Sequence, residues 1–135
     1  MATVETVQGN VDAGELGITL IHEHLRFSDE GVRENWPGRY DEQAELGAAL
    51  EATNAAAGHG VKTIVDPTAM FGGRDVRFMK KVADATGVNV VACTGIYTYD
   101  YLPHFFQTRT PDQIAELFVH DIEVGIQGTT PRPAS

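Results

Sequence analysis

The chain has 135 residues, of which 42% are hydrophobic and 21% are charged, a composition typical of a folded globular domain and not of a disordered or fibrous chain. Its 10 Lys and Arg against 19 Asp and Glu give a formal net charge of -9, which argues against a nucleic-acid or anionic-membrane partner, because both need clustered basic residues. A single cysteine, no apolar run long enough to span a membrane and no secretory signal lead us to expect a soluble cytoplasmic protein.

The first forty residues predict a hairpin, a strand and a loop. Residues 3–11 alternate in polarity and turn at Gly9-Asn10, which indicates a small β-hairpin. Residues 17–24 form a compact apolar run that ends in polar side chains, which predicts a buried strand. Residues 25–40 have no clear period and are expected to form an irregular loop.

From residue 41 onward, helices and strands alternate. A helix is predicted from Asp41 to about residue 57, because apolar side chains recur at helical spacing and acidic residues occupy its first turns. A strand at 61–67, a helix at 74–86 and a strand at 89–96 follow, and then an aromatic loop at 97–101. The run Thr110-Pro111-Asp112-Gln113 carries three helix-start signals and predicts a third helix, which fades at Gly125.

The order strand–helix, repeated three times with strands apolar on both faces, predicts an α/β fold in which helices cover a parallel sheet. This pattern does not separate an open doubly wound sheet from part of a closed barrel. The sequence contains neither of the glycine-rich phosphate-binding motifs, so a nucleotide-binding function has no support.

His22 and His24 stand at the end of the first predicted sheet strand. Because side chains alternate along a strand, both imidazoles are expected on one face, where they could reach a single metal at about 2.0–2.1 Å. The alternative is a pair of ordinary histidines at a polar strand end, one of them bonded to a loop carbonyl.

Asp66 and Tyr97 follow the next two strands. Ligands of parallel sheets bind at the carboxyl ends of the strands, so these side chains are expected at the same rim as the histidines. Asp66 could orient a ligand or cap the turn that follows it. Tyr97 could line a pocket with its hydroxyl, or pack beneath its own loop.

Three segments of the chain read LGITLIHEHL at 16–25, VKTIVDPT at 61–68 and TGIY at 94–97. They resemble the phosphotriesterase family, and are closest to its phosphotriesterase-like lactonase branch. They occur in the family's order, and the likeness runs from about residue 4 to Gly128.

The resemblance implies a (β/α)₈ barrel with a binuclear metal centre at the carboxyl ends of its strands. It makes His22 and His24 ligands of the more buried metal, and it places Tyr97 over the other metal, where it would position the substrate's carbonyl oxygen. A hydroxide held by the metals would attack a lactone carbonyl or the phosphorus of an organophosphate triester. The implied cofactor is a divalent metal, zinc first and cobalt, manganese or iron otherwise, and the implied substrate is a small ester or lactone. A full-length member would be expected to form a homodimer.

The sequence departs from the family pattern after the third helix. The family continues with a strand that carries a carboxylated lysine bridging both metals, and then with two more histidines and an aspartate; the lysines here are Lys62, Lys80 and Lys81, none at that position. A complete barrel needs about 250 residues. We therefore expect residues 1–128 to form the amino-terminal portion of a barrel, about three strand–helix units after a hairpin, and residues 129–135 to be a tail outside the family pattern.

Such a truncated or frame-shifted chain is expected to be inactive alone. One alternative is a non-catalytic remnant or interaction fragment that needs a complementary carboxy-terminal half. Another is a small open α/β binding domain unrelated to the family.

Overall fold

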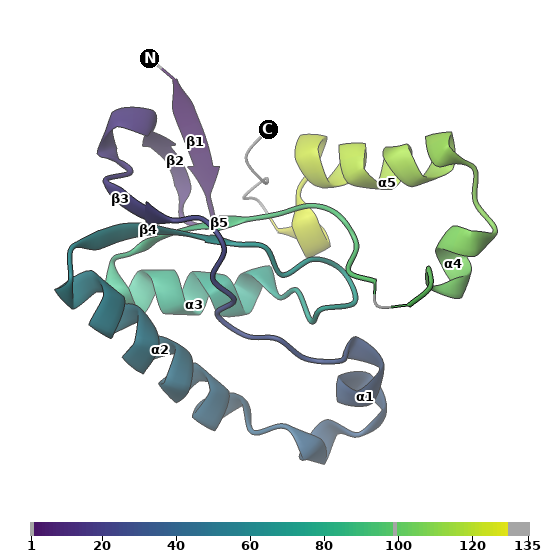
Figure 1. Ribbon diagram of the computed structural model, residues 1–135, viewed down its shortest axis with the longest axis horizontal. Helices are drawn as coiled ribbons and strands as arrows, with labels where there is room; N and C mark the ends of the chain where they lie inside the picture. The colour runs from purple at the N-terminus through teal and green to yellow at the C-terminus, as the bar shows by residue number, and fades with distance from the viewer. Residues whose placement is uncertain (1, 99, 130–135) are drawn as a thin grey trace.

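The computed structural model describes residues 2–98 and 100–129. The predicted tail at 129–135 therefore lies, apart from Thr129, outside the described residues. Within them the chain forms a small hairpin, a parallel sheet and helices packed beside that sheet (Figure 1). No helix in this part of the chain is both long and apolar enough to cross a membrane.

The hairpin consists of β1 (Thr3–Thr6) and β2 (Gly9–Asp12), which pair antiparallel. Thr6 is the pairing partner of Gly9, so the turn lies at Val7 and Gln8, and the predicted turn at Gly9-Asn10 is wrong by two residues. The Thr6 hydroxyl explains the earlier turn. It donates to the carbonyl of Gly9 at 2.7 Å and accepts from the backbone N–H of Gln8 at 3.2 Å, which closes the loop.

The main sheet contains β3 (Ile18–Leu20), β4 (Val61–Asp66) and β5 (Asn89–Ala92), all parallel and in that spatial order. The three strands were predicted, but each ends earlier than its apolar run, at Leu20 instead of residue 24, at Asp66 instead of 67 and at Ala92 instead of 96. Beyond the end of β4, the Asp66 carboxylate accepts from the backbone N–H groups of Leu25 and Thr68.

The α-helices of the described chain confirm the three predicted ones and add two short ones. They are α1 (Glu30–Asn35), α2 (Glu42–Gly58), α3 (Val76–Thr86), α4 (His104–Gln107) and α5 (Pro111–Glu123), and the 3₁₀ turns are η1 (Ala13–Glu15), η2 (Pro37–Arg39) and η3 (Ile126–Gly128). Asp41 and Asp75 cap α2 and α3, and Thr110 forms a capping box with Gln113 at the start of α5.

The expectation of an irregular loop at 25–40 is wrong, because this segment contains α1 and η2. The side chain of Asp29 accepts from the backbone N–H of Val32 at 2.8 Å and so starts α1. The helix has six residues and buries none of them, so it leaves no apolar period in the sequence.

Helices α2 and α3 lie side by side on one side of the sheet (Figure 1). Phe78 and Val82 of α3 pack with Ala49 of α2, and an adjacent face of α3 packs with Val90 of β5 and with Val7 of the hairpin turn. The core therefore lies around α3, between α2 and β5.

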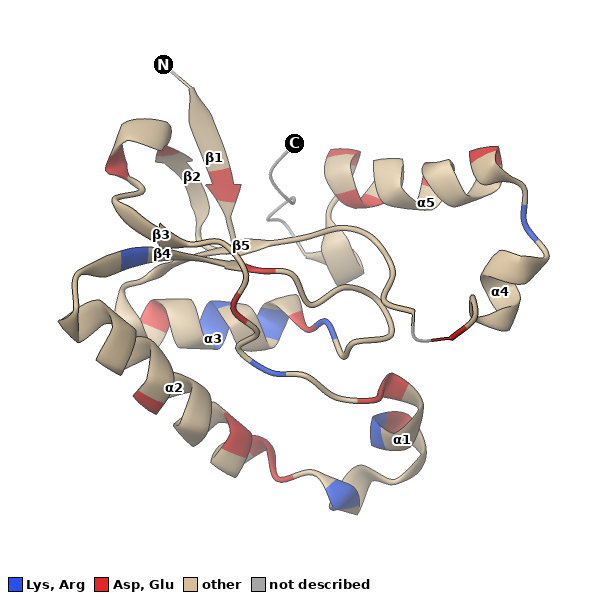
Figure 2. Ribbon diagram, in the orientation of Figure 1, with Lys and Arg blue, Asp and Glu red and all other residues tan. Residues whose placement is uncertain are grey.

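Acidic residues lie along α1, α2 and α5, whereas Arg77, Lys80 and Lys81 lie on α3 (Figure 2). Lys81 of α3 is bonded to Glu42 of α2 at 2.7 Å, and Lys80 to Asp84 at 2.9 Å. The hydrogen bond from Lys81 lowers the pKa of the Glu42 carboxyl. Much of the limited positive charge is thus engaged in ion pairs between and along helices.

Replacing Thr53 with valine is expected to raise the free energy of unfolding by about 1 kcal/mol, because a buried hydroxyl without a hydrogen bond costs about 1–3 kcal/mol. Thr53 lies in α2, is 2% exposed, and its hydroxyl has no partner among the described residues. Valine has the same shape and lacks the hydroxyl. The urea midpoint of the variant measures the change, and a lower midpoint than that of the unmodified chain would contradict the expectation.

Candidate active site

His22 and His24 lie beyond the end of β3, in a segment that is not a strand. The expectation that strand alternation orients them is therefore wrong, since β3 ends at Leu20. Their rings are nevertheless in contact, with centroids 5.5 Å apart and planes at 86°. The backbone N–H of Glu23, between them, donates to the carbonyl of Val65 at 3.2 Å, so the segment still runs along β4. The structure thus brings the two predicted imidazoles together by a different local geometry.

A row of edge-to-face rings connects the histidines to Tyr97. The ring of Phe27 lies 5.4 Å from that of His24 and 5.1 Å from that of Tyr97, with planes at 85° and 73°. The backbone N–H of Tyr97 donates to the carbonyl of Met70 at 2.7 Å, which holds Tyr97 beside the loop after β4. Three segments from the carboxyl ends of the strands therefore meet here, as the sequence predicts.

Asp66 caps the turn after β4. Its Oδ1 accepts from the backbone N–H of Thr68 at 2.8 Å, and its Oδ2 accepts from the backbone N–H of Leu25 at 3.1 Å. The side chain is 1% exposed. Of the two interpretations that the sequence left open, capping is the one this geometry matches. The same carboxylate also holds residues 22–25, which we call the histidine segment, against β4.

His24 is oriented by neighbours on the loop after β4. Its Nδ1 lies 2.7 Å from Oγ1 of Thr68 and 3.8 Å from Oδ1 of Asp66. Because Nδ1 is engaged in this way, Nε2 is the nitrogen of His24 that remains for a ligand.

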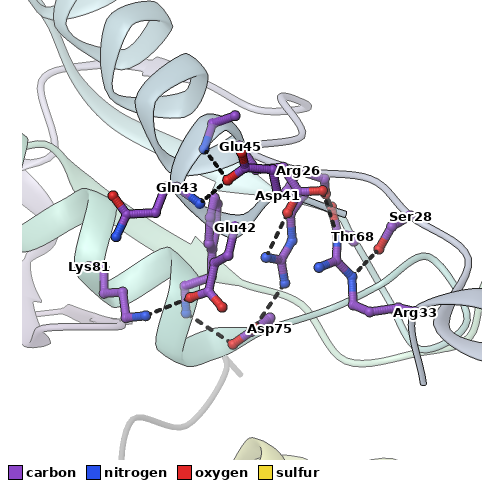
Figure 3. Close-up of polar contacts among 12 residues, drawn as sticks. Arg26, Ser28, Arg33, Asp41, Glu42, Gln43, Glu45, Thr68, Asp75 and Lys81 are labelled. Carbon is purple, nitrogen blue, oxygen red and sulfur yellow. Dashed lines mark hydrogen bonds and ion pairs between the residues drawn. The ribbon is translucent and has the colours of Figure 1, made fainter. Parts of the chain in front are cut away.

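Arg26 fastens the histidine segment to two helices (Figure 3). Its guanidinium bonds Asp75, the N-cap of α3, at 2.8 Å and Glu45 of α2 at 3.3 Å, and it stacks 4.2 Å above the ring of Phe78. The side chain is 8% exposed. Arg33 also bonds Glu45, at 2.7 Å. These contacts fix the backbone two residues after His24.

A cavity of about 710 Å³ lies beside Tyr97. Its lining includes Phe71 and Tyr101 together with the carboxylates of Asp29 and Glu30. Its volume is within the range of small-molecule sites, roughly 300–1,000 Å³. Phe106 is 2% exposed and packs on Phe71.

Cys93 follows β5 and has no sign of activation. Burial raises the pKa of its thiol, so the neutral form is favoured. The raised pKa favours a packing role for Cys93 over a nucleophilic one.

The donor set fits a metal in part. Two adjacent imidazoles, one of them with its Nδ1 in a hydrogen bond with Thr68, are the arrangement expected of histidine ligands. Imidazole nitrogen suits zinc, cobalt, manganese or iron. Within residues 2–98 and 100–129, no group of three or more His, Cys, Asp or Glu side chains is placed so that it could hold a metal.

Several residues of the site were not identified from the sequence. Phe27 and Arg26 stand in a segment without periodicity, and Thr68 follows a strand-ending proline. The one sequence signal available was the run Asp66-Pro67-Thr68, in which a polar residue on each side of the proline follows a buried strand.

The family model of the phosphotriesterase family matches residues 2–132 of the chain. An aryldialkylphosphatase of Saccharolobus solfataricus is 54% identical over 120 residues, which are 89% of this chain and 38% of that protein. A phosphotriesterase homology protein of Mycobacterium tuberculosis is 35% identical over 137 residues, covering 96% of this chain and 42% of that protein.

Solved structures agree with these sequence matches. A mutant organophosphorus hydrolase from Deinococcus radiodurans superposes with a TM-score of 0.88 at 32% identity, covering 98% of this chain and 42% of that one. The predicted fold, a portion of a (β/α)₈ barrel that follows a hairpin, is thereby confirmed. The chain spans less than half the length of the relatives that it matches.

Proposed function

Because the chain belongs to the phosphotriesterase family, we propose that it supplies metal-binding and substrate-positioning residues to a metal-dependent hydrolase of lactones and organophosphate triesters. The observation that carries the proposal is the contact between the rings of His22 and His24 beside Thr68. Similarity to an aryldialkylphosphatase and to an organophosphorus hydrolase supports organophosphate triesters as substrates.

In this proposal His22 and His24 hold a divalent metal, with zinc as the first choice. When bound, such a metal polarises the oxygen under attack and lowers the pKa of a water molecule. Tyr97 positions the substrate's oxygen, and the cavity beside it admits a small ester or lactone. Phe27 lies between Tyr97 and His24 and shields the histidines on that side. A cytoplasmic location, and a homodimer for a full-length protein, belong to the same proposal.

A specific observation favours a second candidate, a fragment that complements a separate carboxy-terminal half. Strand β3 pairs with β4 on one side, and no strand among the described residues pairs with its other edge. Ile18 of β3 is 60% exposed and Ile21, just beyond it, is 76% exposed. An unpaired edge with exposed apolar side chains is a surface on which another strand can add.

A zinc titration of the full chain tests the proposed ligands. Replacing both His22 and His24 with alanine is expected to lower zinc affinity by at least about 100-fold, since the partners that orient such ligands are themselves worth about 10–100-fold. The matched control replaces His59, the C-cap of α2, and His120, in α5, and should leave the affinity unchanged. Equal losses in the two double variants would contradict the assignment.

Hydrolysis then separates the two candidate functions. A dialkyl aryl phosphate and a γ-lactone are offered with zinc to the chain alone, and to the chain mixed with the carboxy-terminal half of the archaeal relative. Turnover by the chain alone supports the hydrolase, and turnover only after mixing supports the complementing fragment. Turnover that survives loss of both histidines would contradict a metal role for them.

A further inference from the structure

The hydroxyl of Thr68 lies between two groups that compete for its single hydrogen. Oγ1 is 3.2 Å from the carbonyl oxygen of Arg26 and 2.7 Å from Nδ1 of His24. A carbonyl oxygen can only accept, whereas a ring nitrogen of neutral histidine can donate or accept. Thr68 therefore donates to Arg26, and its oxygen accepts a hydrogen bond from Nδ1–H of His24.

The contact between Asp66 and His24 supports the same direction for the hydrogen bond between His24 and Thr68. Oδ1 of Asp66 lies 3.8 Å from Nδ1 of His24, and this carboxylate is buried. A lone pair on Nδ1 would face that negative charge, while an N–H bond there is attracted to it. Both neighbours thus place the hydrogen on Nδ1, which leaves the lone pair of the neutral ring on Nε2.

The carbonyl that receives the Thr68 hydrogen is itself held in place. The side chain of Arg26 bonds Asp75 and Glu45, as Figure 3 shows, and it stacks on Phe78. Thr68 is 1% exposed, so water does not compete for its hydroxyl. A chain of contacts therefore runs from α2 and α3 through Arg26 and Thr68 to the ring of His24.

We propose that Thr68 is a positioning residue that fixes the neutral ring of His24 as the Nδ1–H tautomer, so that Nε2 is the nitrogen offered to a divalent metal. The metal in this statement rests on the proposed function. The direction of the hydrogen bond rests on the contacts of Thr68 and Asp66 alone.

The test reads the tautomer directly by two-bond ¹H–¹⁵N correlation spectra of the histidine rings, recorded without metal at about pH 8, where histidine is neutral. In the unmodified chain, His24 is expected to show a protonated Nδ1 and an unprotonated Nε2. Thr68→Val, which keeps the shape and lacks the hydroxyl, should move His24 towards a mixture of tautomers. Thr68→Ser should restore the original spectrum, and Thr53→Val, the same substitution at a hydroxyl without a partner among the described residues, should leave it unchanged.

The result that overturns the proposal is a protonated Nε2 in the unmodified chain, and this reading does not depend on whether Thr68→Val folds. An unchanged spectrum in a folded Thr68→Val would also overturn it, because Asp66 alone would then set the tautomer. In a parallel zinc titration, Thr68→Val is expected to lower affinity by about 10–100-fold and Thr68→Ser to recover most of it. Failure of the unmodified chain to bind zinc would count against the proposed function, while the tautomer still decides the role of Thr68.

Discussion

Replacing Asp121 with alanine is expected to lower the free energy of unfolding by about 3–5 kcal/mol, the cost of leaving one member of a buried ion pair without its partner. Oδ2 of Asp121, in α5, lies 2.7 Å from Nη1 of Arg74, and the two side chains are 8% and 5% exposed. Thr94 donates to the same carboxylate oxygen at 2.8 Å, and Arg74 also donates to the carbonyl of Cys93 at 3.1 Å. Loss of Asp121 leaves the buried guanidinium of Arg74 without its carboxylate partner, and it removes the bond between α5 and the loop after β5.

Equilibrium urea unfolding measures this effect, and two further variants interpret it. Asp84→Ala removes a carboxylate from an exposed pair with Lys80, whose hydrogen bond lowers the pKa of Asp84, and is expected to change stability little. The double variant Arg74→Met with Asp121→Leu should recover most of the loss, because apolar side chains can replace a buried pair. Equal urea midpoints for Asp121→Ala and Asp84→Ala would show that the buried ion pair contributes no more to stability than the exposed one.

Replacing Gly73 with alanine is expected to lower the free energy of unfolding by about 2–5 kcal/mol. Gly73 has a φ of 83°, in the left-handed region, where an L residue costs about 1–2 kcal/mol. A Cβ there would overlap Oγ of Ser28, and would lie 2.8 Å from its carbonyl oxygen and 3.0 Å from its nitrogen. Backbone atoms cannot rotate away as a side chain can, so overpacking adds about 1–3 kcal/mol.

Gly87 supplies the matched control for this prediction. It ends α3 with a φ of 72°, and a Cβ there would meet no atom of the described residues within 4 Å. Gly87→Ala should therefore show the backbone cost alone, and the difference in urea midpoint between the two variants measures the close approach of Gly73 to Ser28. If the two variants unfold at the same urea midpoint, the close approach of Gly73 to Ser28 does not contribute to the loss of stability.

The order of elements could be predicted from the sequence because apolar spacing and capping residues are local signals. Thr110, Pro111 and Gln113 start α5 where they predict it, with a capping box. Strand ends and short helices could not be predicted in this way. The strand run through His24 looks continuous in the sequence, but Asp66, from the neighbouring strand, takes the backbone N–H of Leu25, and no local pattern announces that bond.

The residues of the site also fall into those that the sequence identifies and those that only the structure reveals. His22, His24 and Tyr97 could be selected because their residue types and their places after strands are visible in the sequence, and their metal and catalytic roles remain predictions. Phe27 and Thr68 act through contacts with segments about 40 or more residues away along the chain. Such contacts depend on how the strands are placed side by side, which only the folded structure reveals.

The ion pairs of Arg26 with Glu45 and Asp75 connect the loop after β3 with the starts of α2 and α3. These three segments are distant in the sequence and are expected to share their local stability. Glu45 belongs to the first turns of α2, and Asp75 is the cap of α3. Opening either helix end removes a partner of Arg26, and releasing Arg26 exposes both helix ends. We therefore expect the first turns of α2 and α3 to unfold locally together, where separate helices would fray independently. The loop that carries the histidines is expected to open in the same event.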